Sequence, residues 1–450
     1  MLKGMWLWLD ARLQVRELLR TEGARELPAG TGWLFVLGSL ALSTFLVLVV
    51  TGVLILFVYI PSPDHAADSL YYLHQMNFGR FIHGVHHWGA SAMIVIVFLH
   101  LLRVFFFKAF ARPRELTWIV GIVLLLFTLA MGFTGFLLPW DPEGYWGTVV
   151  GLHIAEQSPL VGGIVGTLLR GGAVMGTQTL SRFFALHVAV LPALMVVFIV
   201  IHLRLVSKLG SAGPLSTPLR GKDSGFAFFP RQVLRDATAA LVVLLLISAL
   251  AMLLPLADRP PADPTDTQYI PRPPWYFLSL FQFLRYVPGR LEPIAAVVIP
   301  GLIVLFLLLV PFIDRRPGRA YLKGRPVAWL VSAGVALAIT LGVLAGPNPN
   351  TAISPLATGP VPPGADAGQQ LYLSVGCGFC HGSDAGGTKD GPSLHKAVLY
   401  RDRPWLLAHF KDPAGLVPGS TMKKFDWLTD DELHQLVDHL IQINRENRPW

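Results

Sequence analysis

The chain has 450 residues, of which 53% are hydrophobic and only 14% are charged, and its formal net charge is +8. Because a soluble protein carries roughly a quarter charged residues, this composition excludes an ordinary soluble domain and indicates a membrane protein. The positive charge does not indicate nucleic-acid binding, since the basic residues gather in segments between long apolar runs.

Seven apolar segments have about the 20 residues needed to cross a bilayer core. They predict an all-α fold, a polytopic transmembrane helical bundle followed by a small all-α C-terminal domain. The first 30 residues are polar and basic and show no cleavable signal peptide, so the first span is expected to be a permanent helix. The predicted spans are Trp33–Ile60, Phe81–Phe107, Thr117–Leu138, Arg182–Val206, Ala237–Leu256, Ile294–Ile313 and Ala328–Ala345.

Lysine and arginine residues are concentrated in four segments that a seven-span chain places on one side of the membrane. By the positive-inside rule that side is cytoplasmic. We therefore expect a bacterial cytoplasmic membrane protein with its N-terminus inside and its C-terminus outside. The basic residues are Arg12, Arg16, Arg20 and Arg25; Lys108, Arg112 and Arg114; Lys208, Arg220, Lys222, Arg231 and Arg235; and Arg315, Arg316, Arg319, Lys323 and Arg325.

Four histidines lie at matched spacing on two spans. His86 and His100 are 14 residues apart on span two, and His187 and His202 are 15 apart on span four. At about 100° per residue each pair returns to within about 40–60° of one direction, about 21–22 Å apart along the axis. An imidazole in hydrocarbon is costly and normally functional. The pattern predicts two b-type haems, an outer one between His86 and His187 and an inner one between His100 and His202, whereas a single membrane histidine could merely bond a neighbouring helix.

Two glycine pairs repeat this spacing: Gly38 and Gly52 on span one, and Gly121 and Gly135 on span three, are each 14 residues apart. A missing side chain lets a flat macrocycle lie against a helix, so these glycines are expected to border the haems. Small residues also serve helix–helix packing, which is the alternative reading.

The amino-acid composition changes after Gly346. A Pro/Gly/Ala-rich linker is expected over residues 347–364, followed by a polar domain over 365–450. The only two cysteines lie in Cys377-Gly-Phe-Cys380-His381. This motif predicts covalent attachment of a c-type haem, with His381 as an iron ligand. A thioredoxin-like motif would need a βαβ setting, and a zinc site would need two further ligands.

Met422 is the only methionine of this domain and is the predicted second iron ligand, because a thioether raises the potential of a His-ligated iron. The alternatives are His395, His409, His434 and His439. Helices are predicted over Asp366–Gly376 and Asp430–Ile443, the second capped by Thr429 with Glu432. The arrangement is similar to a small class I cytochrome c, including its Gly391-Pro-Ser-Leu segment.

The first 220 residues resemble the cytochrome b subunit of bc1 and b6f complexes, and residues 221–346 resemble the small b6f subunit, here fused. The 15-residue histidine spacing and the count of four plus three spans resemble the b6f branch. The matching strings are His86-His-Trp-Gly-Ala-Ser, Phe98-Leu-His100-Leu-Leu-Arg103, Gly135-Phe-Leu-Leu-Pro-Trp-Asp and Arg182-Phe-Phe-Ala-Leu-His187.

The resemblance implies a quinol:acceptor oxidoreductase that oxidises quinol at an outer site, reduces quinone at an inner site and generates a protonmotive force. Its implied partners are a Rieske iron–sulfur protein, a soluble or membrane electron acceptor, membrane lipid, and a second copy of the complex, with no nucleic acid. The alternatives are a haem-binding anchor for another dehydrogenase and a haem sensor without quinol turnover.

The outer quinol site departs from the family. The family string Pro-Glu-Trp-Tyr is Pro273-Pro-Trp275-Tyr276 here, so the carboxylate that would accept a quinol proton is missing. Quinol oxidation still releases protons and needs a base. Glu143, in the loop after span three, is the predicted substitute, although it could be an ordinary solvated acid.

The haem sites and the inner quinone site also depart from the family pattern. Val36 stands where b6f proteins have the cysteine of an extra haem, so three haems are expected in all, two b and one c. His83 replaces the usual propionate-binding arginine, so Arg80 is the candidate for that role, and Arg103 is a further cofactor-binding candidate. Arg235 and Asp236 match the family's inner quinone-binding pair, with an interfacial anchor as the alternative.

Overall fold

The computed structural model describes residues 2–159, 161–172, 174–213, 225–264, 269, 271–287, 291–315, 325–346, 365–388, 391–395, 397–417, 420 and 422–446. The predicted linker over residues 347–364 lies outside this part of the chain. So do five of the basic residues named above: Arg220, Lys222, Arg316, Arg319 and Lys323. The chain divides into a membrane unit, Met1–Ala257 with Pro273–Gly346, and a C-terminal unit, Asp258–Arg272 with Pro347–Trp450.

Among its described residues, the membrane unit contains seven helices that are long and apolar enough to cross a bilayer, as predicted. The fourth begins five residues before the predicted span and the fifth begins six before it, because backbone hydrogen bonds continue a helix beyond its apolar run. The spans are α3 (Leu37–Leu56), α5 (Gly79–Phe106), α6 (Glu115–Leu137), α9–η2–α10 (Thr177–Leu209), α11 (Arg231–Leu253), η5–α13 (Ile294–Ile313) and α14 (Pro326–Leu344).

The fourth span contains a π-helical turn, η2 (Leu186–Val190), between α9 (Thr177–Ala185) and α10 (Leu191–Leu209). Pro192 follows this turn and has no N–H to continue the α-helical ladder, and the Leu191 N–H instead bonds the Leu186 carbonyl. A π-turn inserts one extra residue into a helix. It therefore accounts for the 15-residue spacing of His187 and His202, where span two uses 14.

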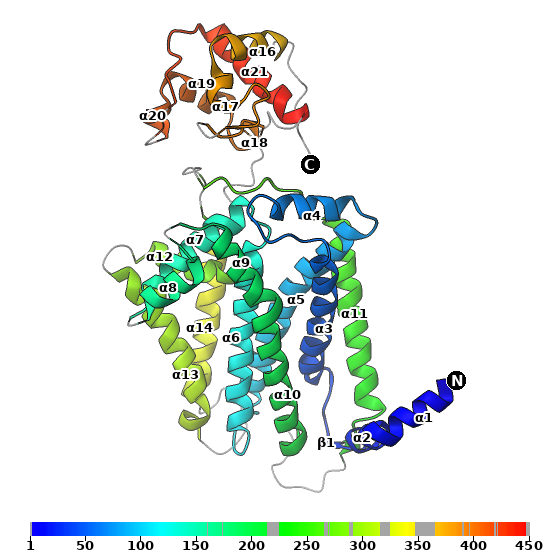
Figure 1. Ribbon diagram of the computed structural model, residues 1–450. Helices are drawn as coiled ribbons and strands as arrows, with labels where there is room; N and C mark the ends of the chain where they lie inside the picture. Colours follow the sequence, from blue (N-terminus) through cyan, green and yellow to red (C-terminus); the bar gives the residue numbers. More distant parts are fainter. Residues whose placement is uncertain are drawn as a thin grey trace. The chain divides into compact units, whose positions relative to one another are not determined.

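Short elements cover the two ends of the bundle (Figure 1). Helices α4 and α7 lie at one end, and α2 lies at the other with a two-stranded antiparallel ribbon, in which Leu27 pairs with Phe226. These elements are α1 (Leu2–Leu13), α2 (Val15–Gly23), β1 (Glu26–Leu27), η1 (Trp33–Phe35), α4 (Ala66–Gln75), α7 (Pro142–Glu156), α8 (Gly162–Arg170), β2 (Phe226–Ala227), η3 (Trp275–Phe277) and α12 (Leu278–Arg285).

A buried ion cluster joins the last two spans to span two. Asp314, at the end of α13, accepts from the Lys108 ammonium at 3.1 Å and from the Arg325 guanidinium at 2.9 Å, and all three side chains are at most 4% exposed. Arg325 also donates to the Phe106 carbonyl at 3.2 Å. Buried charges are tolerated only when paired in this way, so the cluster fixes α13 and α14 against the end of α5.

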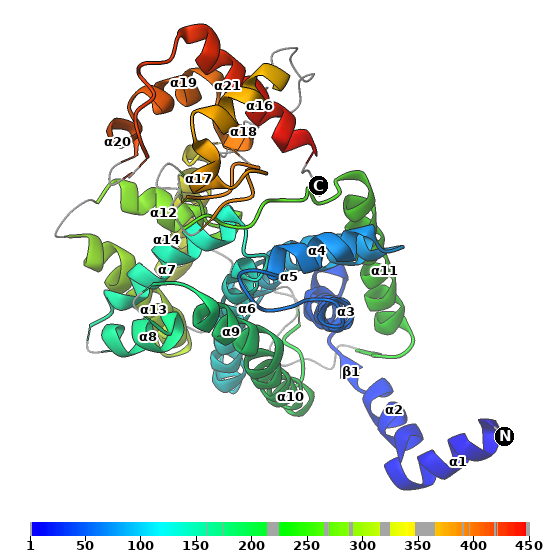
Figure 2. The same ribbon diagram turned by 45° about the horizontal axis from the view of Figure 1, so that its top comes forward.

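The C-terminal unit is a small helical domain in which α16 crosses α21 (Figure 2). Gly368 permits the crossing, because a Cβ there would overlap the Gln435 carbonyl oxygen. The predicted cap of the last helix is confirmed, since Thr429 and Glu432 exchange hydrogen bonds. The helices are α16 (Ala365–Ser374), α17 (Cys377–His381), α18 (Ala397–Tyr400), α19 (Arg403–Lys411), α20 (Pro413–Leu416) and α21 (Asp430–Glu446).

Candidate functional site

The outer histidine pair faces across the bundle interior. His86 lies on α5 and His187 on the π-turn η2, with ring centroids 6.3 Å apart. A metal–imidazole bond is about 2 Å long, so this separation accommodates one metal ion between the facing ring nitrogens. The pair fits the bis-histidine ligation of a b-type haem.

Two threonines hold these rings, and they were missed in the sequence. The Thr51 hydroxyl donates to the Val47 carbonyl and lies 3.0 Å from His86 Nδ1. Thr134 donates to the Ala130 carbonyl and lies 3.2 Å from His187 Nδ1. Each hydroxyl can therefore accept the Nδ1 proton, which leaves Nε2 free to bind iron. The only sequence signal is that each threonine directly precedes one of the spaced glycines.

Each of the four predicted glycines lies against the ring of one of the four histidines. A Cβ at any of them would press on an imidazole, so the glycines leave room for the iron ligands as well as for a flat macrocycle. The distances from an added Cβ to the nearest histidine Cε1 are 3.3 Å for Gly38 and His100, 3.2 Å for Gly52 and His86, 3.5 Å for Gly121 and His202, and 2.5 Å for Gly135 and His187.

The arginine candidates lie at opposite ends of α5. The Arg103 guanidinium, one turn beyond His100, stacks 3.7 Å above the Phe35 ring. Arg80 donates to the Leu256 carbonyl at 2.7 Å, beyond the end of α11. His83 Nδ1 lies 2.8 Å from His74 Nε2, so the residue at the family's arginine position bonds α4 instead.

The Pro-Pro-Trp-Tyr segment bridges the second and third spans. Trp275 donates from its indole N–H to the Ser91 hydroxyl of α5 at 3.3 Å. The Tyr276 hydroxyl packs against Gly132 of α6, where a Cβ would approach it to 2.8 Å. Burial raises the pKa of Tyr276, so this phenol stays protonated. Glu143 is half-buried in the first turn of α7.

In the C-terminal domain, His381 is the candidate for one of the two iron ligands. The ring is 9% exposed, and its Nδ1 lies 2.8 Å from the Pro392 carbonyl oxygen. An Nδ1–H bond to that carbonyl leaves Nε2 for a metal. Cys377 and Cys380 lie on the same short helix without a disulfide between them, and burial raises the pKa of the Cys377 thiol to about 11. Met422 packs against the domain core, and this set of residues fits a c-type haem.

An open cavity of about 580 Å³ lies at the N-terminal end of α11, which the sequence predicts to be the inner end. Arg235 lines it and donates to the Thr31 carbonyl at 2.7 Å. Asp236, the other predicted inner-site residue, instead accepts from Gln232 at 2.9 Å and bonds Ser39. The residues that line the cavity are Ala29, Gly30, Thr31, Gly32, Gly225, Phe226, Arg231 and Arg235.

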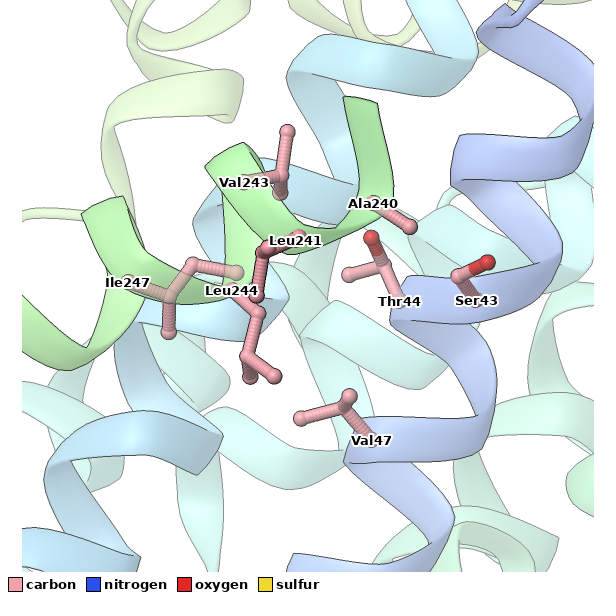
Figure 3. Close-up of a pocket in the computed structure, with 8 residues that line it drawn as sticks. All are labelled: Ser43, Thr44, Val47, Ala240, Leu241, Val243, Leu244 and Ile247. Atoms are coloured by element: carbon pink, nitrogen blue, oxygen red, sulfur yellow. The ribbon is translucent and has the colours of Figure 1, made fainter. Parts of the chain in front are cut away.

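A second, apolar groove of about 140 Å³ lies between α3 and α11 (Figure 3). Apolar side chains such as Val47 and Leu244 line most of it. Ser43 and Thr44 supply the only hydroxyl groups among its described lining residues. The Ser43 hydroxyl already donates to the Ser39 carbonyl. The lining therefore suits a hydrocarbon chain rather than a charged ligand.

Three family models match this chain. Residues 25–210 match the family model described as cytochrome b/b6/petB, residues 261–358 match cytochrome b(C-terminal)/b6/petD, and residues 365–444 match cytochrome c.

Among relatives, the chain is 41% identical to the menaquinol:cytochrome c reductase cytochrome b subunit of Bacillus subtilis (strain 168), over 48% of this chain and all of that one. It is 36% identical to the cytochrome bc complex cytochrome b subunit of Chlorobaculum thiosulfatiphilum, over 63% of this chain and 66% of that one. A solved structure, a hyperthermophilic respiratory Complex III, matches with a TM-score of 0.65 and 28% identity, over 75% of this chain and 94% of that chain.

Proposed function

This chain belongs to the cytochrome b family, as a quinol:cytochrome c oxidoreductase subunit with a cytochrome c domain fused behind it, and we propose that it oxidises quinol near the outer membrane surface. In this proposal one electron crosses the membrane from the His86–His187 site to the His100–His202 site. It then reduces a quinone near the inner surface. The other electron leaves through a Rieske protein toward the c-type site.

The facing of His86 and His187 at 6.3 Å carries the proposal. Two histidine sites at the two ends of the same helices suit stepwise electron transfer across an insulating bilayer. The haem supplies a centre that accepts and releases one electron at a time. The protein's own residues hold the imidazoles, leave space beside them and keep the site in hydrocarbon.

The Rieske cluster must come from another polypeptide, because the only two cysteines of this chain lie in the Cys377–Cys380 motif. Since basic residues concentrate on one side, we assign that side to the bacterial cytoplasm and the c domain to the outer face. Proton release outside and uptake inside then generate a protonmotive force. A homodimeric complex is part of the same proposal.

The quinol-site residues are assigned in the same way. Trp275 and Tyr276 form one wall of the outer pocket, supported by their contacts with α5 and α6. Glu143 accepts a proton from quinol in place of the missing family carboxylate. Arg80 and Arg103 neutralise haem propionates at the outer and inner ends.

A redox titration of the purified complex, monitored by haem absorbance, tests the proposal. We expect two b components and one c component, and rapid b reduction by added quinol that an outer-site inhibitor abolishes. The haem-binding anchor or sensor makes the opposite prediction, because its haems would not be reduced by quinol and no Rieske protein would copurify.

A further inference from the structure

The cavity at the inner end of α11 contains a second arginine that the family pattern does not assign. Arg231 and Arg235 are four residues apart and so lie on one face of the helix. Both guanidinium groups lie over the Phe226 ring, at 5.0 Å for Arg231 and 5.8 Å for Arg235. The antiparallel ribbon β1–β2 holds this phenylalanine in place through its pairing with Leu27.

The described lining of this cavity is electropositive. It includes two arginines, and none of its eight described residues is acidic. Asp236 is the nearest carboxylate along α11, yet it bonds Gln232 and Ser39 instead of lining the cavity. A site with two guanidinium groups favours a ligand that carries oxygen atoms and gains negative charge.

The cavity also lies close in the chain to the inner histidine pair. Gly32 lines it, and Gly38, six residues later, packs against His100. Ser39, next to Gly38, bonds Asp236 and so ties α3 to α11 beside the cavity. The cavity lining and the residue that packs on His100 therefore belong to adjoining stretches of the chain, which suits an acceptor site served by that histidine pair.

We propose that Arg231, together with Arg235, binds the inner quinone and stabilises its one-electron-reduced anionic form. This inference rests on the proposed function. The haem that His100 and His202 would hold would supply one electron for each quinol oxidised at the outer site. The first electron would convert the quinone to its radical anion without a proton, and the second, together with two protons from the inner aqueous phase, would complete the quinol. Arg235 is anchored on the Thr31 carbonyl, whereas Arg231 is exposed and can turn toward a bound anion.

The test compares R231Q, R231K and the surface control R20Q in the complete purified complex. Arg20 is exposed and pairs with Glu17 on α2. We expect R231Q to reduce the electron paramagnetic resonance signal of the inner quinone radical by about tenfold, the scale of one charge-assisted hydrogen bond. R231K should retain most of the signal, and R20Q should match the wild type. If R231Q loses its b haem spectrum, R231M is the second neutral variant, with the same expected loss.

Three outcomes have distinct meanings. A wild-type radical signal in R231Q, with normal b reduction by quinol, overturns the role of Arg231 but leaves the proposed function intact. No quinol-driven b reduction in the wild-type complex overturns the proposed function itself. Loss of bound phospholipid phosphorus from R231Q with an unchanged radical signal shows that the cavity holds a lipid headgroup, which also overturns the inference.

Discussion

The proposed iron ligands His86 and His187 each have a neighbouring hydroxyl group that can select the tautomer of the imidazole. The hydroxyl groups of Thr51 and Thr134 lie 3.0 and 3.2 Å from the Nδ1 atoms of His86 and His187, so each can accept an Nδ1 proton. At the inner pair the residues before the corresponding glycines are Leu37 and Val120, which have no hydroxyl group. The two histidine pairs therefore differ in whether a threonine hydroxyl lies beside the ring, and hydrogen bonds to a ligating histidine are one way in which a protein sets iron potentials.

Replacing Thr51 or Thr134 by valine should raise the midpoint potential of the outer haem. An accepted Nδ1–H bond makes the imidazole a stronger donor to iron and favours the ferric state, so its loss favours the ferrous state. A redox titration should show this shift in one b component only. Thr128→Val is the matched control, because this buried hydroxyl bonds only the Leu124 carbonyl. Equal shifts in both b components would contradict the assignment.

Glu143→Gln should slow quinol oxidation by about 10²-fold or more, the scale of general-base catalysis, while both b haems stay bound. The measurement is steady-state quinol:acceptor turnover alongside the haem spectrum. Glu115→Gln is the control. Glu115 is the first residue of α6, at the end of that helix far from α7 and Glu143, and it pairs with Arg112. Unchanged turnover in Glu143→Gln would rule out this carboxylate as the proton acceptor.

At the scale of elements, a π-turn in one helix and a close crossing of two others set the positions of particular histidines. The π-turn of span four lets His187 and His202 match the 14-residue spacing on α5 despite one extra residue. In the C-terminal domain the close crossing of α16 and α21 buries His439, which is 5% exposed beside Tyr372. A buried imidazole is stable there only in its neutral form.

Burial lowers the pKa of His439 below the ordinary value of 6.5. Between the lowered folded pKa and 6.5 the unfolded domain binds more protons, so its stability falls as pH decreases through this window. We expect smaller amide protection factors, after correction for the intrinsic pH dependence of exchange, in α16 and α21 of the full chain at low pH than at neutral pH. His439→Leu should flatten this dependence, while the neighbouring His434→Leu should retain it. A pH dependence that survives His439→Leu would assign the effect to another group.

At the scale of the whole molecule, the buried cluster around Asp314 links the two halves of the membrane unit. The four histidines proposed as haem ligands lie on spans two and four, whereas the Trp275–Tyr276 segment precedes the last two spans. The positions of these aromatic residues therefore depend on contacts that hold the second half in place. Lys108, Asp314 and Arg325 provide such a contact at the ends of three helices.

Asp314→Asn should weaken this attachment by about 3–5 kcal/mol, the cost of breaking a buried ion pair by removing one partner. Because the haem ligands lie elsewhere, we expect both b haems to remain while quinol oxidation falls. Protease sensitivity of the last two spans, measured with the haem spectrum, checks this prediction. The exposed Asp64→Asn is the control. Loss of both b haems in Asp314→Asn would show that the cluster supports the entire bundle instead.

The sequence by itself determined the seven spans, the four haem histidines and the Cys377–His381 motif as candidates. These features are local, because apolar length, helical periodicity and short motifs are set along the chain. The Asp430–Glu446 helix and its Thr429 cap were predictable for the same reason.

Only the tertiary structure decided which groups meet across different helices. It brought Thr51 to His86 and placed Asp314 between two cations. It also turned Asp236 toward Gln232 while Arg231 joined Arg235 at the inner cavity. The physical reason is that a hydrogen bond or ion pair between two helices depends on how the helices pack together and how each is rotated about its axis. The periodicity of a single segment sets neither the packing nor the rotation.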